Sequence, residues 1–175
     1  MTTESTMRIV VKAGDLLDER VDVLISSANT QLNMSGGVNG AILHRGGKGV
    51  QAELRAHLKL LGRHWVEPGS VVLTGPGPLA VKHIVHAVAI DAFYGSSVER
   101  VRETVSRALE LAAKQGAATV ALPALATGYG PLSVHQFAEG LRGALAAQYP
   151  GVEELRVVLA SEDDAVVVRE VLGVQ

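Results

Sequence analysis

The sequence predicts a single α/β domain in which helices cover a central β-sheet. Short apolar or β-branched runs alternate along the chain with segments of helical spacing, the pattern of a layered α/β fold. Two runs, residues 70–74 and 82–90, are joined through Gly75-Pro76-Gly77-Pro78 and read as a hairpin-like pair, which favours a mixed sheet. With 175 residues and 47% hydrophobic residues, the chain is expected to form one packed core.

The elements can be assigned in order from their periodicity and turn residues. Strands are expected at residues 7–13, 21–25, 70–74, 82–90, 119–122 and 155–159. Helices are expected at residues 38–45, 50–61, 97–115, 133–148 and 163–172. The helix at 97–115 has the clearest apolar spacing, and Gly116 is its stop signal. Asp18-Glu19-Arg20 is expected to be a polar connection, and residues 1–6 a flexible tail before a single domain at 7–175.

Composition excludes several classes of function. The chain has no cysteine, which removes disulfides, thiolate metal sites and a cysteine nucleophile. A net charge of −2 and 3% aromatic residues argue against binding of free nucleic acid. The polar N-terminus lacks an apolar signal core, and no apolar run approaches the ~18 residues that span a membrane, so we expect a cytoplasmic protein. His83 and His86 face opposite sides of a strand, and no metal site is expected.

Two glycine-bearing loops, Ser35-Gly36-Gly37-Val38 and Ala126-Thr127-Gly128-Tyr129-Gly130, each lie between an expected strand and an expected helix. This arrangement leaves free backbone N–H groups at a helix N-terminus, where an anion can bind. Glycine is also the default turn residue, but two such loops in one small domain indicate a site between two strand ends. The loops lack the Lys-Ser/Thr ending of a P-loop, which argues against an NTPase.

All three asparagines, Asn29, Asn33 and Asn39, lie around the first loop. For Asn33, turn chemistry and ligand binding are equally good interpretations. Asn29 follows a buried strand, and its amide offers the donor and acceptor that suit sugar hydroxyls, so we favour a ligand contact. His44 on the following helix is a candidate base, although a half-exposed helix histidine is the simpler interpretation.

The residues around the first loop resemble the signature of the macrodomain family. The matching stretches are residues 21–29 with Leu32, residues 35–42, Gly14-Asp15, residues 69–74 leading into 82–87, and residues 121–130. They span nearly the whole chain in the right order. The resemblance implies a three-layer α/β/α sandwich with a central mixed β-sheet. It also implies binding of ADP-ribose, free or attached to a macromolecule, without a further cofactor.

The resemblance implies a role for each matching residue. Asp15 would accept a hydrogen bond from the adenine amino group, although a turn or N-cap aspartate is the alternative. Asn29 would contact the distal ribose, and Tyr129 is either a ligand contact or an exposed loop aromatic. The full set of implied ligand contacts is Asp15, Leu16, Asn29, Ser35, Gly36, Gly37, Val38, Asn39, Ala126, Thr127, Gly128, Tyr129 and Gly130.

Three positions depart from the family pattern. Ser26 stands where the family often has a structural Asn. Asn39 stands where the hydrolytic members have an Asp, and a neutral amide cannot act as a general base. Around Ala160, after the last strand, no aromatic is present to stack on adenine, a contact worth ~1–3 kcal/mol. We therefore expect a recognition module. The alternative is an ADP-ribosyl or O-acetyl-ADP-ribose hydrolase in which Asn29 and Asn39 position a water.

Overall fold

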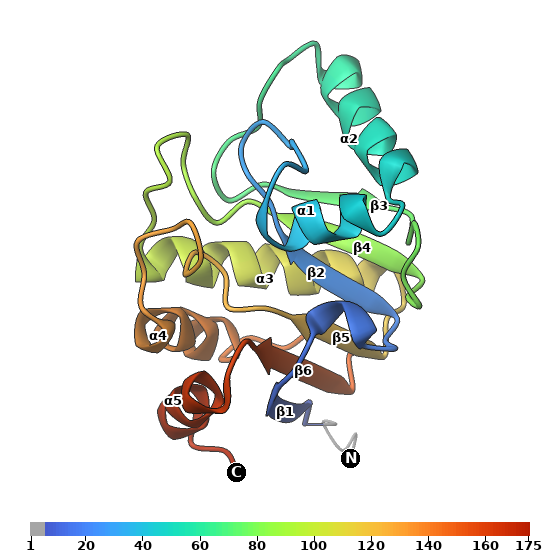
Figure 1. The fold of residues 1–175 in the computed structure, drawn as a ribbon. Coiled ribbons are helices and arrows are strands. Elements are labelled where there is room, and N and C mark those ends of the chain that lie inside the picture. The colour runs from blue at the N-terminus through green and yellow to red at the C-terminus, as the bar shows by residue number, and fades with distance from the viewer. Residues whose placement is uncertain (1–5) are drawn as a thin grey trace.

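The structure, a computed structural model, describes residues 6–175, so the predicted tail lies outside the described residues except for Thr6. One sheet has the strand order β1-β6-β5-β2-β4-β3 (Figure 1). The strands are β1 Arg8–Ala13, β2 Val23–Ser27, β3 Val71–Thr74, β4 His83–Ala87, β5 Thr119–Leu122 and β6 Glu154–Leu159. The helices are α1 Gly37–His44, α2 Lys48–Leu61, α3 Val98–Lys114, α4 Val134–Ala144 and α5 Glu162–Leu172, with a 3-10 turn, η1, at Leu16–Asp18.

The sheet is mixed, as the sequence predicted. Neighbouring strands from β1 to β4 pair in parallel, and β3 pairs antiparallel with β4 at the edge. The predicted hairpin-like pair is therefore confirmed, with Val72 opposite His86 in the register. Because the parallel strands all point the same way, the carboxyl ends of β1, β6, β5 and β2 lie side by side along one edge.

Helices cover both faces of the sheet and complete three layers. Along β2, Ile25 packs into the core under α3, α4 and α5, whereas Leu24 packs into the core under η1, α1 and α2. This separation follows from the alternation of side chains along a strand. Phe137 of α4 and Ile42 of α1 are fully buried in the first and second core respectively. The α/β/α sandwich is confirmed.

Some element ends differ from the prediction. β2 begins two residues later than predicted, and the Asp22 carboxylate just before it accepts the N–H of Ala118 at 2.8 Å. The helix predicted to reach residue 148 ends at Ala144, whose carbonyl accepts the Tyr149 hydroxyl at 2.6 Å.

Glu19 and Arg20 lie in the connection from η1 to β2, as predicted, but Glu19 is only 6% exposed. Its carboxylate forms ion pairs with Lys12 and with Arg156, at 3.0 Å from Arg156. A buried carboxylate is tolerated when it is paired, and here the partners come from β1 and β6. The pair therefore joins the η1 segment to the neighbouring sheet edge, a contact that local sequence does not reveal.

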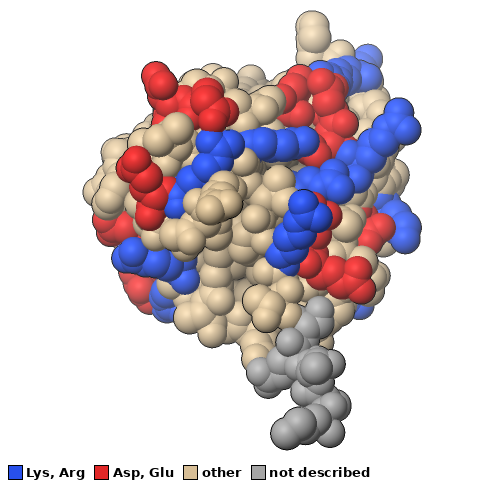
Figure 2. Space-filling view, turned by 90° about the horizontal axis from the view of Figure 1, so that it is seen from below, with Lys and Arg blue, Asp and Glu red and all other residues tan. Residues whose placement is uncertain are grey.

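Acidic and basic side chains are interspersed on the face of the molecule seen from below in Figure 2, around a central uncharged area. This distribution agrees with the net charge of −2. Among residues 6–175, none of the helices combines the length and apolar character needed to cross a membrane.

Candidate functional site

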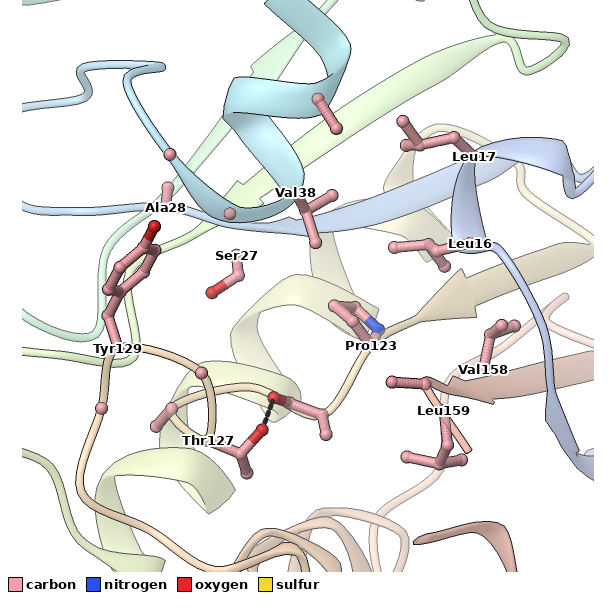
Figure 3. A pocket seen from close by; sticks show the side chains of 18 of the residues that line it. Leu16, Leu17, Ser27, Ala28, Val38, Pro123, Thr127, Tyr129, Val158 and Leu159 are labelled. Atoms are coloured by element: carbon pink, nitrogen blue, oxygen red, sulfur yellow. Dashed lines mark hydrogen bonds between the residues drawn. The ribbon is translucent and has the colours of Figure 1, made fainter. Parts of the chain in front are cut away.

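A cavity of about 780 Å³ opens at the carboxyl ends of β1, β6, β5 and β2 (Figure 3). Gly14 and Pro123 directly follow β1 and β5, whereas Ser27 and Leu159 are the last residues of β2 and β6. A ligand site at this edge is the rule for open α/β sheets, because loops from adjacent strands surround the same space. The volume is in the range of cavities that bind small molecules.

The first glycine loop leads into α1, which begins at Gly37 with Gly36 as its N-cap. Gly37 has φ +61°, a left-handed conformation that favours glycine. Ser35, Gly36, Gly37 and Val38 all line the cavity. Because the first N–H groups of a helix have no acceptor within the helix, the N-terminal turn of α1 offers backbone donors to an anion in the cavity.

The second glycine loop forms the opposite wall. The Thr127 hydroxyl donates to the carbonyl of Ala124 at 2.7 Å, and Ala126 has φ +65° (Figure 3). A Cβ on Gly130 would lie 2.3 Å from the Ala126 carbonyl oxygen, so the tight turn requires glycine there. Gly128, in contrast, faces open space. Residues 126–130 all line the cavity.

Tyr129 of the second loop packs against Gly36 of the first loop. A Cβ on Gly36 would lie 3.1 Å from the Tyr129 hydroxyl oxygen and 3.3 Å from a ring carbon, so the tyrosine ring lies close above this glycine. The side chain is 71% exposed. Both sequence-based interpretations of Tyr129 are therefore compatible with its position, since it is exposed and also lines the cavity.

Asp15 lies at the other end of the cavity and is fixed by two hydrogen bonds. One carboxylate oxygen accepts the N–H of Leu17 at 2.9 Å and caps η1, and the other accepts from the Arg45 guanidinium at 2.9 Å. The predicted N-cap role is therefore present. Both oxygens retain a lone pair, so Asp15 can still accept a hydrogen bond from a ligand. Leu16 lines the cavity next to it.

Asn29 lines the cavity and also closes a turn. Its Nδ2 donates to the carbonyl of Asn33 at 2.9 Å, and its Oδ1 accepts the N–H of Asn33 at 3.0 Å. The Asn29 amide still has one N–H and one lone pair available for a ligand. Asn33 itself is exposed and does not line the cavity, which supports its interpretation as a turn residue.

Asn39 differs from the prediction, because the structure does not place it in the cavity. It is 2% exposed, and its Oδ1 accepts from the Ser26 hydroxyl at 2.6 Å and contacts Nδ1 of His86 at 3.1 Å. The side chain sits in the first turn of α1 and faces the sheet. Asn39 therefore belongs to a buried network between α1 and the sheet and not to the cavity wall.

The His86 imidazole completes this buried network. Since Oδ1 of Asn39 can only accept, Nδ1 carries the proton. Nε2 lies 2.9 Å from the Thr74 hydroxyl, which is also within hydrogen-bond distance of the Gly75 carbonyl at 3.0 Å. Burial lowers the pKa of His86 to about 4. His86 is therefore neutral at physiological pH and has a structural role, as the sequence favoured.

An Asn39→Ala substitution is expected to lower the free energy of unfolding by about 1–3 kcal/mol, because Ser26 and His86 lose a buried hydrogen-bond partner. Part of the loss is offset, because the substitution also removes Nδ2 of Asn39, a buried donor that has no hydrogen-bond partner within residues 6–175. Chemical denaturation would measure the change. A matched substitution at the exposed Asn33, Asn33→Ala, is expected to be nearly neutral; equal destabilisation by both would contradict the buried network.

The cavity also contains residues that the sequence analysis missed, notably Arg45, Tyr94, Pro123, Val158 and Asp164. Arg45 could have been found, because Val38, Ala41 and Arg45 follow helical spacing on one face of α1. Tyr94 comes from a loop after β4 and has no local signal. His44 is exposed and does not line the cavity. Within residues 6–175, no three His, Asp or Glu side chains gather as potential metal ligands.

The fold and the cavity define an α/β/α ligand-binding domain. At its strand ends, two glycine-bearing loops present backbone groups to the cavity. A sequence model described as Macro domain matches residues 25–140, and the chain belongs to this family. A macro domain-containing protein of Streptomyces griseus is 35% identical, covering 100% of both chains.

Two further proteins are similar over most of their length. An O-acetyl-ADP-ribose deacetylase of Cronobacter sakazakii is 30% identical over 95% of this chain and 94% of its own. A solved structure of a mutant Oceanobacillus iheyensis macrodomain with ADPR has a TM-score of 0.82 and 25% identity, covering 94% of this chain and 90% of that one.

Proposed function

We propose that this protein binds ADP-ribose, free or attached to a macromolecule, as a recognition module. The observation that carries the proposal is the pair of glycine loops facing each other across the cavity. Among the described residues that line it, Arg45 is the only Lys or Arg, and it pairs with Asp15 at one end. A diphosphate would therefore be held by the backbone N–H groups of Gly36–Val38 and Ala126–Gly130.

The two ends of the cavity suit the two ends of ADP-ribose. Asp15 offers an acceptor for the adenine amino group, and Leu16, Val158 and Leu159 offer an apolar surface beside it. At the opposite end, Asn29 and the Gly36–Gly37 backbone offer hydrogen-bonding groups for the distal ribose. Ala160 lines the adenine end without supplying an aromatic ring, so adenine contributes less affinity than it would with a stacked partner.

Calorimetric titration with ADP-ribose and AMP tests the proposal. ADP-ribose is expected to bind in the micromolar range and clearly more tightly than AMP, because only ADP-ribose reaches both loops and Asn29. An Asn29→Ala variant is expected to weaken ADP-ribose binding and to leave AMP binding nearly unchanged. Absence of binding heat with ADP-ribose, in protein shown to be folded by circular dichroism, would overturn the proposal.

The second candidate function is hydrolysis of an ADP-ribosyl or O-acetyl-ADP-ribose ester, which is supported by the name of the Cronobacter sakazakii relative. In this reaction a water held by Asn29 and the Gly37 backbone attacks the ester carbonyl, the acyl C–O bond to the ribose breaks, the carboxylic acid is released and the ribose oxygen takes up a proton. The carboxylates that line the cavity are Asp15 at the adenine end and Asp164, which lies in the first turn of α5 after Leu159 and Ala160 of the same end. The water would therefore lack a nearby protein base, and turnover is expected to be slow.

A turnover assay with O-acetyl-ADP-ribose separates the two functions. For a recognition module, acetate release equals that of the buffer blank. For a hydrolase, Asn29→Ala lowers acetate release, whereas His44→Ala leaves it unchanged.

A further inference from the structure

Three of the six aromatic residues in the chain lie near one end of the cavity. Tyr94 and Tyr129 line it and are 52% and 71% exposed, and the neighbouring Phe93 is 91% exposed. The two tyrosine rings have their centroids 6.3 Å apart and are tilted by 48°. Neither ring belongs to the hydrophobic cores, and both line the cavity.

The loop that carries Tyr94 is held in a defined turn. The Asp91 carboxylate accepts the N–H groups of Phe93 and Gly95, each at 2.8 Å. The backbone adds a hydrogen bond from Tyr94 N to Asp91 O at 3.0 Å. Tyr94 has φ +63°, which is uncommon for a residue with a side chain. The turn therefore directs the Tyr94 ring to the cavity, opposite the Tyr129 ring above Gly36.

These rings lie at the end of the cavity that would hold the distal ribose. In Figure 3, Tyr129 is at one end beside Ala28, whereas Leu16 and Leu159 are at the other. With adenine at Asp15 and the diphosphate between the glycine loops, the distal ribose lies next to Gly36 and Asn29. A group attached to the anomeric carbon of that ribose would therefore leave the cavity beside Tyr94 and Tyr129.

The electrostatics of this end indicate which group fits. Arg45 is the only Lys or Arg among the described lining residues, and it is engaged at the opposite end by Asp15 and Asp18, at 2.9 and 3.4 Å. The faces of tyrosine rings are electronegative and attract a planar cation. A polynucleotide would bring phosphates to this end, where none of the described lining residues is a Lys or Arg that could neutralise them.

We propose that Tyr94 and Tyr129 form a subsite for the cationic nicotinamide ring of NAD⁺, so that the intact dinucleotide is a ligand of this protein. The proposal rests on the proposed function, because it takes the ADP-ribose part of NAD⁺ to bind as free ADP-ribose does. The ring lies against the tyrosine faces, and no bond is formed or broken.

Calorimetry of wild-type protein and of Tyr94→Ala, Tyr94→Phe and Phe93→Ala variants with ADP-ribose, NAD⁺ and NADH tests the subsite. Wild-type protein is expected to bind NAD⁺ at least as tightly as ADP-ribose. NADH is expected to bind more weakly, because its dihydropyridine ring is neutral and not aromatic. Tyr94→Ala is expected to weaken NAD⁺ about tenfold relative to ADP-ribose, within the range of a lost aromatic stack.

Two variants serve as controls. Tyr94→Phe keeps the ring and is expected to retain NAD⁺ binding. Phe93→Ala removes a neighbouring exposed ring that does not line the cavity, and it is expected to have no effect.

The outcomes separate the subsite from the proposed function. Binding of ADP-ribose without NAD⁺, or an unchanged NAD⁺ to ADP-ribose affinity ratio in Tyr94→Ala, overturns the subsite alone. Equal affinity for NADH and NAD⁺ overturns the assignment to a cationic ring. Binding of none of the three ligands by wild-type protein overturns both proposals.

Discussion

A Gly128→Val substitution is expected to reduce ADP-ribose affinity by at least about a hundredfold, equivalent to ~3 kcal/mol of binding free energy. Gly128 lines the cavity in the second glycine loop, and a Cβ there would meet no protein atom within 4 Å. The valine side chain would therefore occupy space that the proposed diphosphate needs, without disturbing the packing of the protein. Titration calorimetry measures the affinity, and thermal melting measures the stability.

The melting temperature of Gly128→Val is expected to stay close to that of the wild type. Gly49→Val is a matched control, because a Cβ on Gly49 would also meet no protein atom within 4 Å, and Gly49 lies in α2, away from the cavity. This control is expected to leave affinity unchanged. A parallel loss of affinity and melting temperature in Gly128→Val would show that the glycine is purely structural.

Gly37→Val tests the phosphate path less directly than Gly128→Val does. Its φ of +61° means that a β-branched side chain strains the backbone as well as entering the cavity. In the sequence, Gly37 and Gly128 are equivalent as loop glycines. The structure separates them, since only Gly128 has both ordinary backbone angles and open space.

The free energy of unfolding is expected to fall by about 3 kcal/mol as the pH drops from about 6.5 to about 4, because His86 is buried in the neutral form. The pKa of His86 is lowered from 6.5 to about 4 in the folded protein. Between these values the unfolded chain binds a proton that the folded protein does not, so acid favours unfolding. The contribution is complete above the unfolded pKa and is lost as the pH approaches the folded pKa.

Urea denaturation at several pH values, performed on wild-type protein and on His86→Gln, measures this contribution. Glutamine remains polar in the buried site between Thr74 and Asn39 but does not titrate. Effects of the acidic residues are common to both proteins and cancel in the difference. The variant is expected to be less stable at neutral pH and to have the flatter pH dependence. Identical slopes in both proteins would refute the assignment to His86.

Much of the fold follows from local sequence. The alternation of apolar runs with helical segments indicates the α/β layers, and Gly75-Pro76-Gly77-Pro78 indicates the antiparallel pair at the sheet edge. The element ends are harder to predict, because long-range contacts decide them. At the start of β2, for example, the Asp22 carboxylate binds the N–H of Ala118, which is far away in the sequence.

Much of the cavity wall also follows from the sequence. The two glycine loops, Asp15 and Asn29 line the cavity, since residues after adjacent parallel strands must meet at one sheet edge. Loop glycines and turn residues are recognisable because their backbone conformations restrict which residue types can occur.

The tertiary structure alone decided where two other side chains lie. Asn39 is close in sequence to the first loop, yet the rotation of α1 buries it against Ser26 and His86. Tyr94 is distant in sequence from Tyr129, yet the Asp91 turn brings its ring to the same opening. Periodicity determines which residues share a face of one element, but the packing of several elements determines which face meets the cavity.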